Sequence, residues 1–96
     1  MDLKYPTGPT KGLIEQMSNL QQFKAKNFSR FNTLTGREVD VLTLIADGLQ
    51  NPQIAERLGI SRNTVQNHRA SIKDKLGISD QTEYIKYAFA YDLIQF

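Results

Sequence analysis

Residues 51–77 read NPQIAERLGISRNTVQNHRASIKDKLG and contain two short amphipathic segments on either side of a turn. Asn51 is a typical helix cap, and Pro52 fits the first helical position, where its missing N–H is not needed. Gly59 favours the left-handed conformation that ends many helices, and Ser61 can cap the helix that follows. The stretch therefore predicts two helices joined by a break of about three residues.

The second predicted helix, Arg62 to Leu76, has two different faces when its residues are spaced at about 100°. Apolar side chains project to one side, polar or small side chains to the other, and basic side chains occupy a flank between them. The apolar side comprises Val65, Ile72 and Leu76, the polar side Asn63, Gln66, Asn67 and Ala70, and the flank Arg62, Arg69 and Lys73.

This pattern is typical of a helix-turn-helix unit, in which the second helix enters the DNA major groove. Side-chain amides such as those of Gln66 and Asn67 can pair bidentately with adenine, while Arg and Lys bind phosphates. We therefore expect the polar face to contact bases and its surroundings to contact phosphates. The predicted base contacts are Gln66, Asn67, Ala70 and Asn63, and the predicted phosphate contacts are Arg62, Thr64, His68, Arg69, Lys73 and Asn51.

Two further helices flank this unit. Thr35-Gly36-Arg37-Glu38 forms a capping-box pattern and predicts a helix over 36–47. Asp80 with Glu83 predicts another helix, extending to about Leu93. No segment has the pattern of a strand, so the predicted fold class is all-α.

The N-terminal third has a different character. Two of the three prolines and a glycine lie within Tyr5 to Thr10, which predicts a flexible leader over residues 1–9. Leu13, Met17 and Leu20 then recur at helical spacing and predict an amphipathic helix over Lys11 to Lys26. We expect residues 1–32 to be a leader and linker helix, and residues 33–96 to form a four-helix domain that folds alone.

Composition narrows the function. A chain of 96 residues without cysteine and with one histidine cannot build a zinc-thiolate or multi-histidine centre, so we expect no enzyme activity and no cofactor. Ser71, His68 and Asp74 share one helix and do not form a catalytic triad. Neither a membrane span nor a signal peptide is evident, which favours a cytoplasmic protein. Four basic residues against one acidic residue in 61–77 fit a phosphate partner or a solvated helix face equally well.

Residues 34–94 resemble the LuxR/FixJ-type (GerE-like) domain of bacterial transcription regulators. The resemblance rests on many spacings at once: Leu34-Thr35-Gly36-Arg37-Glu38, Val41-Leu42, Leu44-Ile45-Ala46-Asp47-Gly48, Asn51, Ile54-Ala55, Leu58, Ile60-Ser61, Thr64-Val65, His68, Ile72 and Lys75-Leu76. It implies a four-helix domain that binds double-stranded DNA, commonly as a homodimer through its last helix. Family members often carry Lys or Arg where this chain has amides and alanine, which makes guanine a less favoured target here.

The last predicted helix carries two stripes. We assign Ile85, Phe89 and Leu93 to the core, and expect Tyr84, Tyr87, Ala88 and Tyr91 to form the dimer interface. Two other functions fit a helix-turn-helix pattern. One is a promoter-binding module like region four of a sigma factor, with RNA polymerase as a further candidate partner, and the other is a helical protein-interaction module that does not bind DNA.

Overall fold

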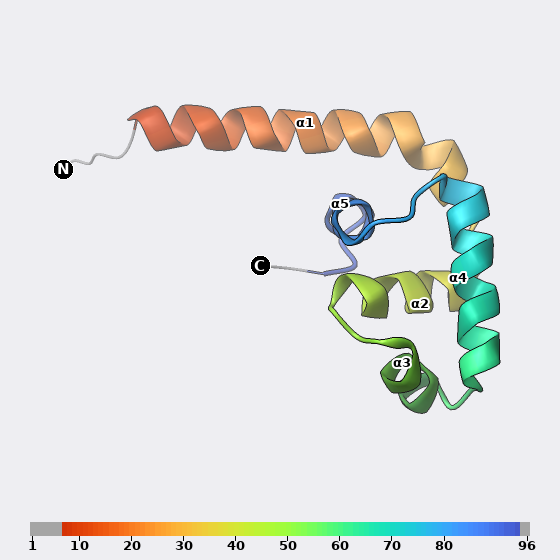
Figure 1. The fold of residues 1–96 in the computed structure, drawn as a ribbon. Helices are drawn as coiled ribbons and strands as arrows, with labels where there is room; N and C mark the ends of the chain where they lie inside the picture. Colours follow the sequence, from red (N-terminus) through yellow and green to blue (C-terminus); the bar gives the residue numbers. More distant parts are fainter. Residues whose placement is uncertain (1–6, 95–96) are drawn as a thin grey trace.

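The computed structural model describes the backbone of residues 7–94 and the side chains of residues 19–94. Five helices follow one another: α1 (Thr7–Phe31), α2 (Gly36–Ala46), α3 (Asn51–Leu58), α4 (Arg62–Leu76) and α5 (Gln81–Ala90). Helices α2 to α5 form the body, and α1 runs along one end of it and extends well past it (Figure 1). No strand occurs in residues 7–94, so the all-α prediction is confirmed for this part of the chain.

Local capping sets the starts of α2, α4 and α5 where the sequence predicts them. At α2, Thr35 Oγ1 accepts from the Glu38 amide at 3.1 Å, and Glu38 Oε1 accepts from the Thr35 amide at 2.9 Å. At α4, Ser61 Oγ accepts from the Thr64 amide at 3.0 Å, and Asp80 caps α5 in the same way. Each cap satisfies an amide that has no partner within its own helix.

The start of α3 differs from the prediction by one residue. Gln50 is the N-cap and Asn51 is already the first helical residue, so Asn51 does not cap the helix. Gln53 Oε1 accepts from the Gln50 amide at 2.8 Å and so satisfies the backbone N–H of the N-cap residue. The Asn51 side chain is thereby available for contacts outside α3.

The first helix is longer than predicted at both ends. It begins at Thr7, although Pro9 was expected to exclude helix there, because proline is tolerated in the first turn, where its missing N–H has no helical acceptor. It continues to Phe31, five residues beyond the predicted end, since its last turns pack on α5. Residues 1–6 of the predicted leader lie outside the described residues.

The last helix ends at Ala90, earlier than the predicted end near Leu93. Asp92 adopts a left-handed conformation with φ of 61°, which stops the helix. The Leu93 amide then donates to the Ala88 carbonyl at 2.7 Å, closing the turn. The chain after Ala90 therefore folds back against the end of α5.

The hydrophobic core lies where α2 meets α4 and α5, with α3 packed on α4. Its largest fully buried side chains come from α2 and from the two helices of the helix-turn-helix region, α3 and α4. They are Val41, Leu42, Ile45, Ile54, Val65, Ile72 and Leu76. Burying a side chain of this kind contributes about 1.5–3 kcal/mol, so this cluster fixes how α4 sits on the body.

The tyrosine stripe of α5 is buried, contrary to the prediction of an exposed partner surface. Tyr84, Tyr87 and Ala88 are 4%, 2% and 0% exposed, and Tyr91 is partly buried. Aromatic side chains of α1 cover Tyr87 and Tyr91, whereas the Tyr84 ring lies beneath Arg69 of α4. Ile85, Phe89 and Leu93, expected in the core, are only partly buried.

Two aromatic contacts hold α1 on α5, and we refer to Phe23, Phe31, Tyr87 and Tyr91 as the aromatic clamp. Phe23 meets Tyr87 edge-on with ring centroids 4.9 Å apart, and Phe31 stacks on Tyr91 at 3.9 Å. Tyr91 Oη also donates to the Lys24 carbonyl at 2.7 Å. Aromatic pairs of this geometry add about 0.5–1.5 kcal/mol each beyond the area that they bury.

A buried carboxylate joins α2 to α4. Glu38 is 4% exposed, and its carboxylate accepts from Ser71 Oγ at 2.5 Å and from Lys75 Nζ at 2.7 Å. Burial alone would raise the pKa of Glu38, but the hydrogen bonds from Lys75, Ser71 and the Thr35 amide, with the charge of Lys75, lower it to about 2. The ionised form is therefore a structural part of the fold.

We expect Glu38→Gln to lower the free energy of unfolding by about 3 kcal/mol at neutral pH, since one pKa unit corresponds to about 1.4 kcal/mol. Because the folded-state pKa is depressed, this stabilisation is complete above pH 4.5 and is lost as the pH falls toward 2. Urea unfolding between pH 2 and 7 measures both effects, and the variant should lose less stability in acid than the wild type.

Asp40→Asn is the matched control, because Asp40 pairs with Arg37 on the surface at 3.7 Å. Such exposed pairs contribute at most about 1 kcal/mol, so this variant should stay close to the wild type. Equal losses in the two variants would contradict the structural role of Glu38.

We also expect residues 33–96 to unfold cooperatively when produced alone, but at a lower temperature than the full chain. The core of α2 to α5 is intact in that fragment, whereas Tyr87 and Tyr91 lose Phe23 and Phe31. Thermal unfolding followed by circular dichroism compares the two. An unfolded fragment would show that α1 is an essential part of the core, and an unchanged melting temperature would show that the aromatic clamp adds no stability.

Candidate nucleic-acid interface

The α3–α4 unit has the turn that the sequence predicts. Gly59 ends α3 in the left-handed conformation with φ of 68°, which an L side chain rarely adopts. The Ile60 amide donates to the Ala55 carbonyl at 3.0 Å, and Ser61 caps α4 immediately afterwards. The two helices thus cross steeply over a short connection, as Figure 1 shows.

The face of α4 that points away from the body is polar and accessible. All four predicted base contacts are exposed, whereas Val65 and Ile72 on the opposite side are fully buried. The exposed four are Asn63, Gln66, Asn67 and Ala70. Their spacing of three and four residues places them in one row along the helix. A single α-helix fits into the major groove, so such a row can face the base edges.

The predicted phosphate contacts fall into two groups. Arg62 and Lys73 are exposed, while Thr64, His68, Arg69 and Asn51 are partly buried. Thr64 Oγ1 lies 2.9 Å from Ser61 Oγ within the cap of α4, so its hydroxyl already has a partner. The fully accessible cations of this set are therefore Arg62 and Lys73, at opposite ends of α4.

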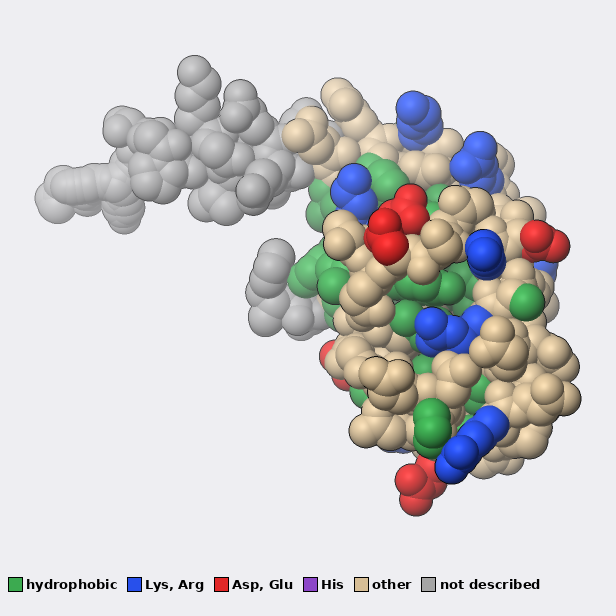
Figure 2. Space-filling model, in the orientation of Figure 1, with side chains coloured by type: hydrophobic (Ala, Val, Ile, Leu, Met, Phe, Trp, Pro, Cys, Tyr) green, Lys and Arg blue, Asp and Glu red, His purple; other side chains and the backbone are tan. Residues whose placement is uncertain are grey.

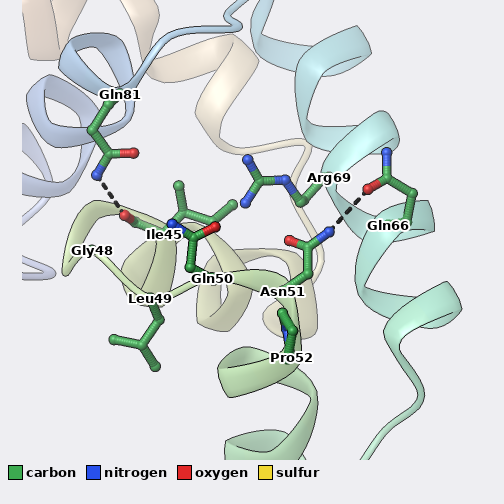
Figure 3. A pocket seen from close by; sticks show the side chains of 9 residues that line it. All are labelled: Ile45, Gly48, Leu49, Gln50, Asn51, Pro52, Gln66, Arg69 and Gln81. Carbon is green, nitrogen blue, oxygen red and sulfur yellow. Dashed lines mark hydrogen bonds between the residues drawn. The ribbon is translucent and has the colours of Figure 1, made fainter.

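Two predicted site residues that are distant in sequence meet in the structure. Asn51 Nδ2 donates to Gln66 Oε1 at 3.0 Å, which links the first residue of α3 to the exposed face of α4. Asn51 was expected to contact phosphate and Gln66 to contact a base. The structure makes them one hydrogen-bonded pair, as Figure 3 shows.

A hollow of about 750 Å³ lies beside this pair, between the α2–α3 connection, α4 and the start of α5. Its lining includes Arg69 and Gln81, whose contacts with distant parts of the chain could not be derived from helical spacing alone. Arg69 lies 5.9 Å from the centroid of the Tyr84 ring, and Gln81 Nε2 donates to the Ile45 carbonyl at 2.6 Å (Figure 3). The lining residues are Ile45, Gly48, Leu49, Gln50, Asn51, Pro52, Gln66, Arg69 and Gln81.

Gln81 carries no sequence signal that predicts its place in this region. It is the first residue of α5, and the only local signal there was the Asp80 cap. Its amide reaches the α2 carbonyl 36 residues earlier in the chain, a contact that no short-range pattern encodes. Arg69 was assigned to phosphate, but its guanidinium faces the hollow and the Tyr84 ring.

Charge is spread over this side of the molecule. Figure 2 shows Lys and Arg side chains at several places between α1 and α3, with acidic side chains at fewer places. Within the part of the chain that the structure describes, no helix combines the length and apolar character needed to cross a bilayer.

Comparison with known proteins agrees with this geometry. The family model for bacterial regulatory proteins of the luxR family (GerE) matches residues 32–88, which include α2, α3, α4 and most of α5. The chain is also 39% identical over 88 residues to the oxygen regulatory protein NreC of Staphylococcus aureus strains JH9 and JH1. These alignments cover 91% of this chain but only 41% of each relative, so the chain spans less than half the length of the relatives. By the extent of the family match and the helix-turn-helix built by α3 and α4, the chain belongs to the luxR family of bacterial regulatory proteins and carries its DNA-binding domain.

Proposed function

We propose that this chain regulates transcription by binding double-stranded DNA sequence-specifically, with α4 in the major groove. The observation that carries the proposal is the row of exposed polar side chains on α4, directly opposite its buried apolar side. A helix that only packed between partners would not need amides on its outer face. A helix that reads base edges does.

The four exposed residues offer different chemistry to a groove. Asn67 and Asn63 present both a donor and an acceptor, and no hydrogen bond to another described residue occupies their side chains. Ala70 presents a methyl group, which suits the C5 methyl of thymine. We infer that Asn67, at the centre of the row, contributes most to discrimination between bases.

Phosphate binding is proposed for the residues around that row. Arg62 and Lys73 are exposed at the two ends of α4, and His68 and Arg69 lie beside the row with part of their surface accessible. The first turns of α3 and α4 add backbone amides, which favour anions. These contacts would set the position of α4 without selecting a base sequence.

A binding function rather than a catalytic one is supported by the state of Ser71. Its hydroxyl donates to the Glu38 carboxylate, whose pKa is lowered to about 2, so this carboxylate is a weak base for activating the oxygen at neutral pH. We further propose that the chain acts on cytoplasmic DNA, with residues 1–32 as a linker and 33–96 as the DNA-binding domain. RNA polymerase at the regulated promoter is the protein partner that this function implies.

We also propose that two copies bind adjacent half-sites as a homodimer. Tyr84, Tyr87 and Ala88 are too buried to supply the contact, so the accessible side of α5 is the surface available. A small contact of this kind associates weakly in solution and is strengthened when DNA brings two copies together.

The dimer proposal predicts cooperative binding to two half-sites about 10 base pairs apart, centre to centre, and one copy on a single half-site. Electrophoretic mobility shift with both duplexes, combined with sedimentation velocity of the free chain, measures stoichiometry and self-association. Non-cooperative binding at the paired site at every spacing from 9 to 12 base pairs would show that the chain acts as a monomer.

Replacing Asn67 with alanine should weaken binding to the preferred duplex by about 1–3 kcal/mol and to a scrambled duplex much less, because a base contact is lost. Replacing Lys73 with alanine should weaken both duplexes alike and reduce the slope of log K against log salt by about 0.9, because a phosphate contact is lost. Fluorescence anisotropy at four salt concentrations measures both variants.

Lys26→Ala serves as the charge control, since it removes an exposed lysine from α1 rather than from α4. Alanine is a good helix former, so all three variants should keep the wild-type melting temperature. If Asn67→Ala and Lys73→Ala weaken the two duplexes in the same ratio, α4 does not read bases and the proposed function is wrong.

A further inference from the structure

The pair formed by Asn51 and Gln66 restricts how Gln66 can meet a base. An unrestrained glutamine amide can turn over, so that either its oxygen or its nitrogen leads, and it can pair with adenine through both. In this structure Gln66 Oε1 accepts from Asn51 Nδ2 at 3.0 Å. The oxygen end is held toward α3, and one of its two lone pairs is occupied.

The Nε2 group of the same amide is available to donate hydrogen bonds to a base. Gln66 is exposed, and its Nε2 makes no hydrogen bond to any other described residue. Figure 3 shows Nε2 on the side of the Gln66 amide away from Asn51. What Gln66 offers beyond the pair is therefore mainly two N–H donors.

The backbone of Asn51 is held in place, so the fold sets the position from which its side chain reaches Gln66. It is the first residue of α3, is partly buried, and lines the hollow with Gln66. The start of α3 is fixed by the bond from the Gln50 amide to Gln53, and α3 is fixed on α4 by the buried Ile54 and Val65. A side chain that is positioned in advance loses little entropy on binding and keeps its partner oriented.

We propose that Asn51 is a specificity-determining positioning residue, which orients the Gln66 amide with its NH₂ group toward the base. This inference rests on the proposed function, because it assumes that α4 reads bases. In the major groove, guanine and thymine present a carbonyl oxygen, whereas adenine and cytosine present an amino group. At the base that Gln66 meets, the wild type should favour guanine or thymine over adenine or cytosine, which reverses the adenine preference expected for an unrestrained amide.

The substitution Asn51→Asp tests the proposal directly. In Asn51→Asp the residue at position 51 can only accept, so Gln66 must turn its Nε2 toward α3 and present its oxygen to the base. Base preference should then pass to adenine or cytosine. An acidic residue in the first turn of a helix is favourable, so the fold should be retained.

Gln53→Glu is the matched control. It adds the same negative charge to the first turns of α3, on an exposed side chain, and a carboxylate still accepts from the Gln50 amide. Both variants should bind all DNA more weakly than the wild type, because each adds charge near phosphates. Only Asn51→Asp should change which base is preferred.

The experiment starts from the duplex that the wild-type chain selects from a random library. Binding of Gln66→Ala to duplexes varied at each position identifies the base pair that Gln66 reads, as the position where preference disappears. Wild type, Asn51→Asp and Gln53→Glu are then titrated with the four duplexes that differ at that pair. We expect a preference of about fivefold for guanine or thymine in the wild type, the effect of one neutral hydrogen bond, and its reversal in Asn51→Asp.

The possible results separate this inference from the function on which it rests. If the wild type selects no sequence, the proposed function fails and the inference fails with it. If the wild type selects a sequence but Gln66→Ala changes no preference, or if Asn51→Asp keeps the preference of Gln53→Glu, the function stands and the positioning role of Asn51 is overturned.

Discussion

The Glu38 carboxylate is the constraint on which the arrangement of this domain depends. It closes the capping box that starts α2, and it also accepts from Ser71 and Lys75 on α4. Lys75 in turn donates to the Thr33 carbonyl at 3.1 Å, so the segment between α1 and α2 is tied to the same point. A buried charge is tolerated only when its hydrogen bonds are complete, and here both oxygens are satisfied.

That arrangement explains why α4 presents the same face outward throughout its length. Glu38 holds the C-terminal half of α4 through Ser71 and Lys75, while Val65 and Ile54 hold its N-terminal half on α3. A helix fixed at both ends cannot rotate about its axis to change which residues are exposed. The polar row, including Gln66 and Asn67, is therefore a rigid surface rather than an adaptable one.

Most features that depend on neighbours in sequence could be predicted, with the start of α3 as an exception, and those that depend on distant neighbours could not. The caps at Thr35, Ser61 and Asp80 were predicted because each is a bond over three residues. The exposed face of α4 followed from helical spacing. The packing of Tyr87 was predicted wrongly, since its hydroxyl donates to Asn27, 60 residues away, on a helix whose docking the sequence does not reveal.

The candidate site divides in the same way. Its residue types and their face on α4 could be read from the sequence, but the bond between Asn51 and Gln66 depends on the crossing of two helices. The early start of α3 also mattered, because it released the Asn51 side chain from a capping role. A difference of one residue in a helix boundary thus changes the chemistry that the site presents.

The aromatic clamp attaches α1 to the body through the C-terminal part of the helix. Phe23 and Phe31 are held on α5, while the 25 residues of α1 rise about 37 Å in total at about 1.5 Å per residue. A tilt of about 10° at the clamp would move the far end of such a helix by several ångströms, roughly the rise of one helical turn. A force on the start of α1 would therefore act on the tyrosines of α5 with a larger moment than the same force applied close to them.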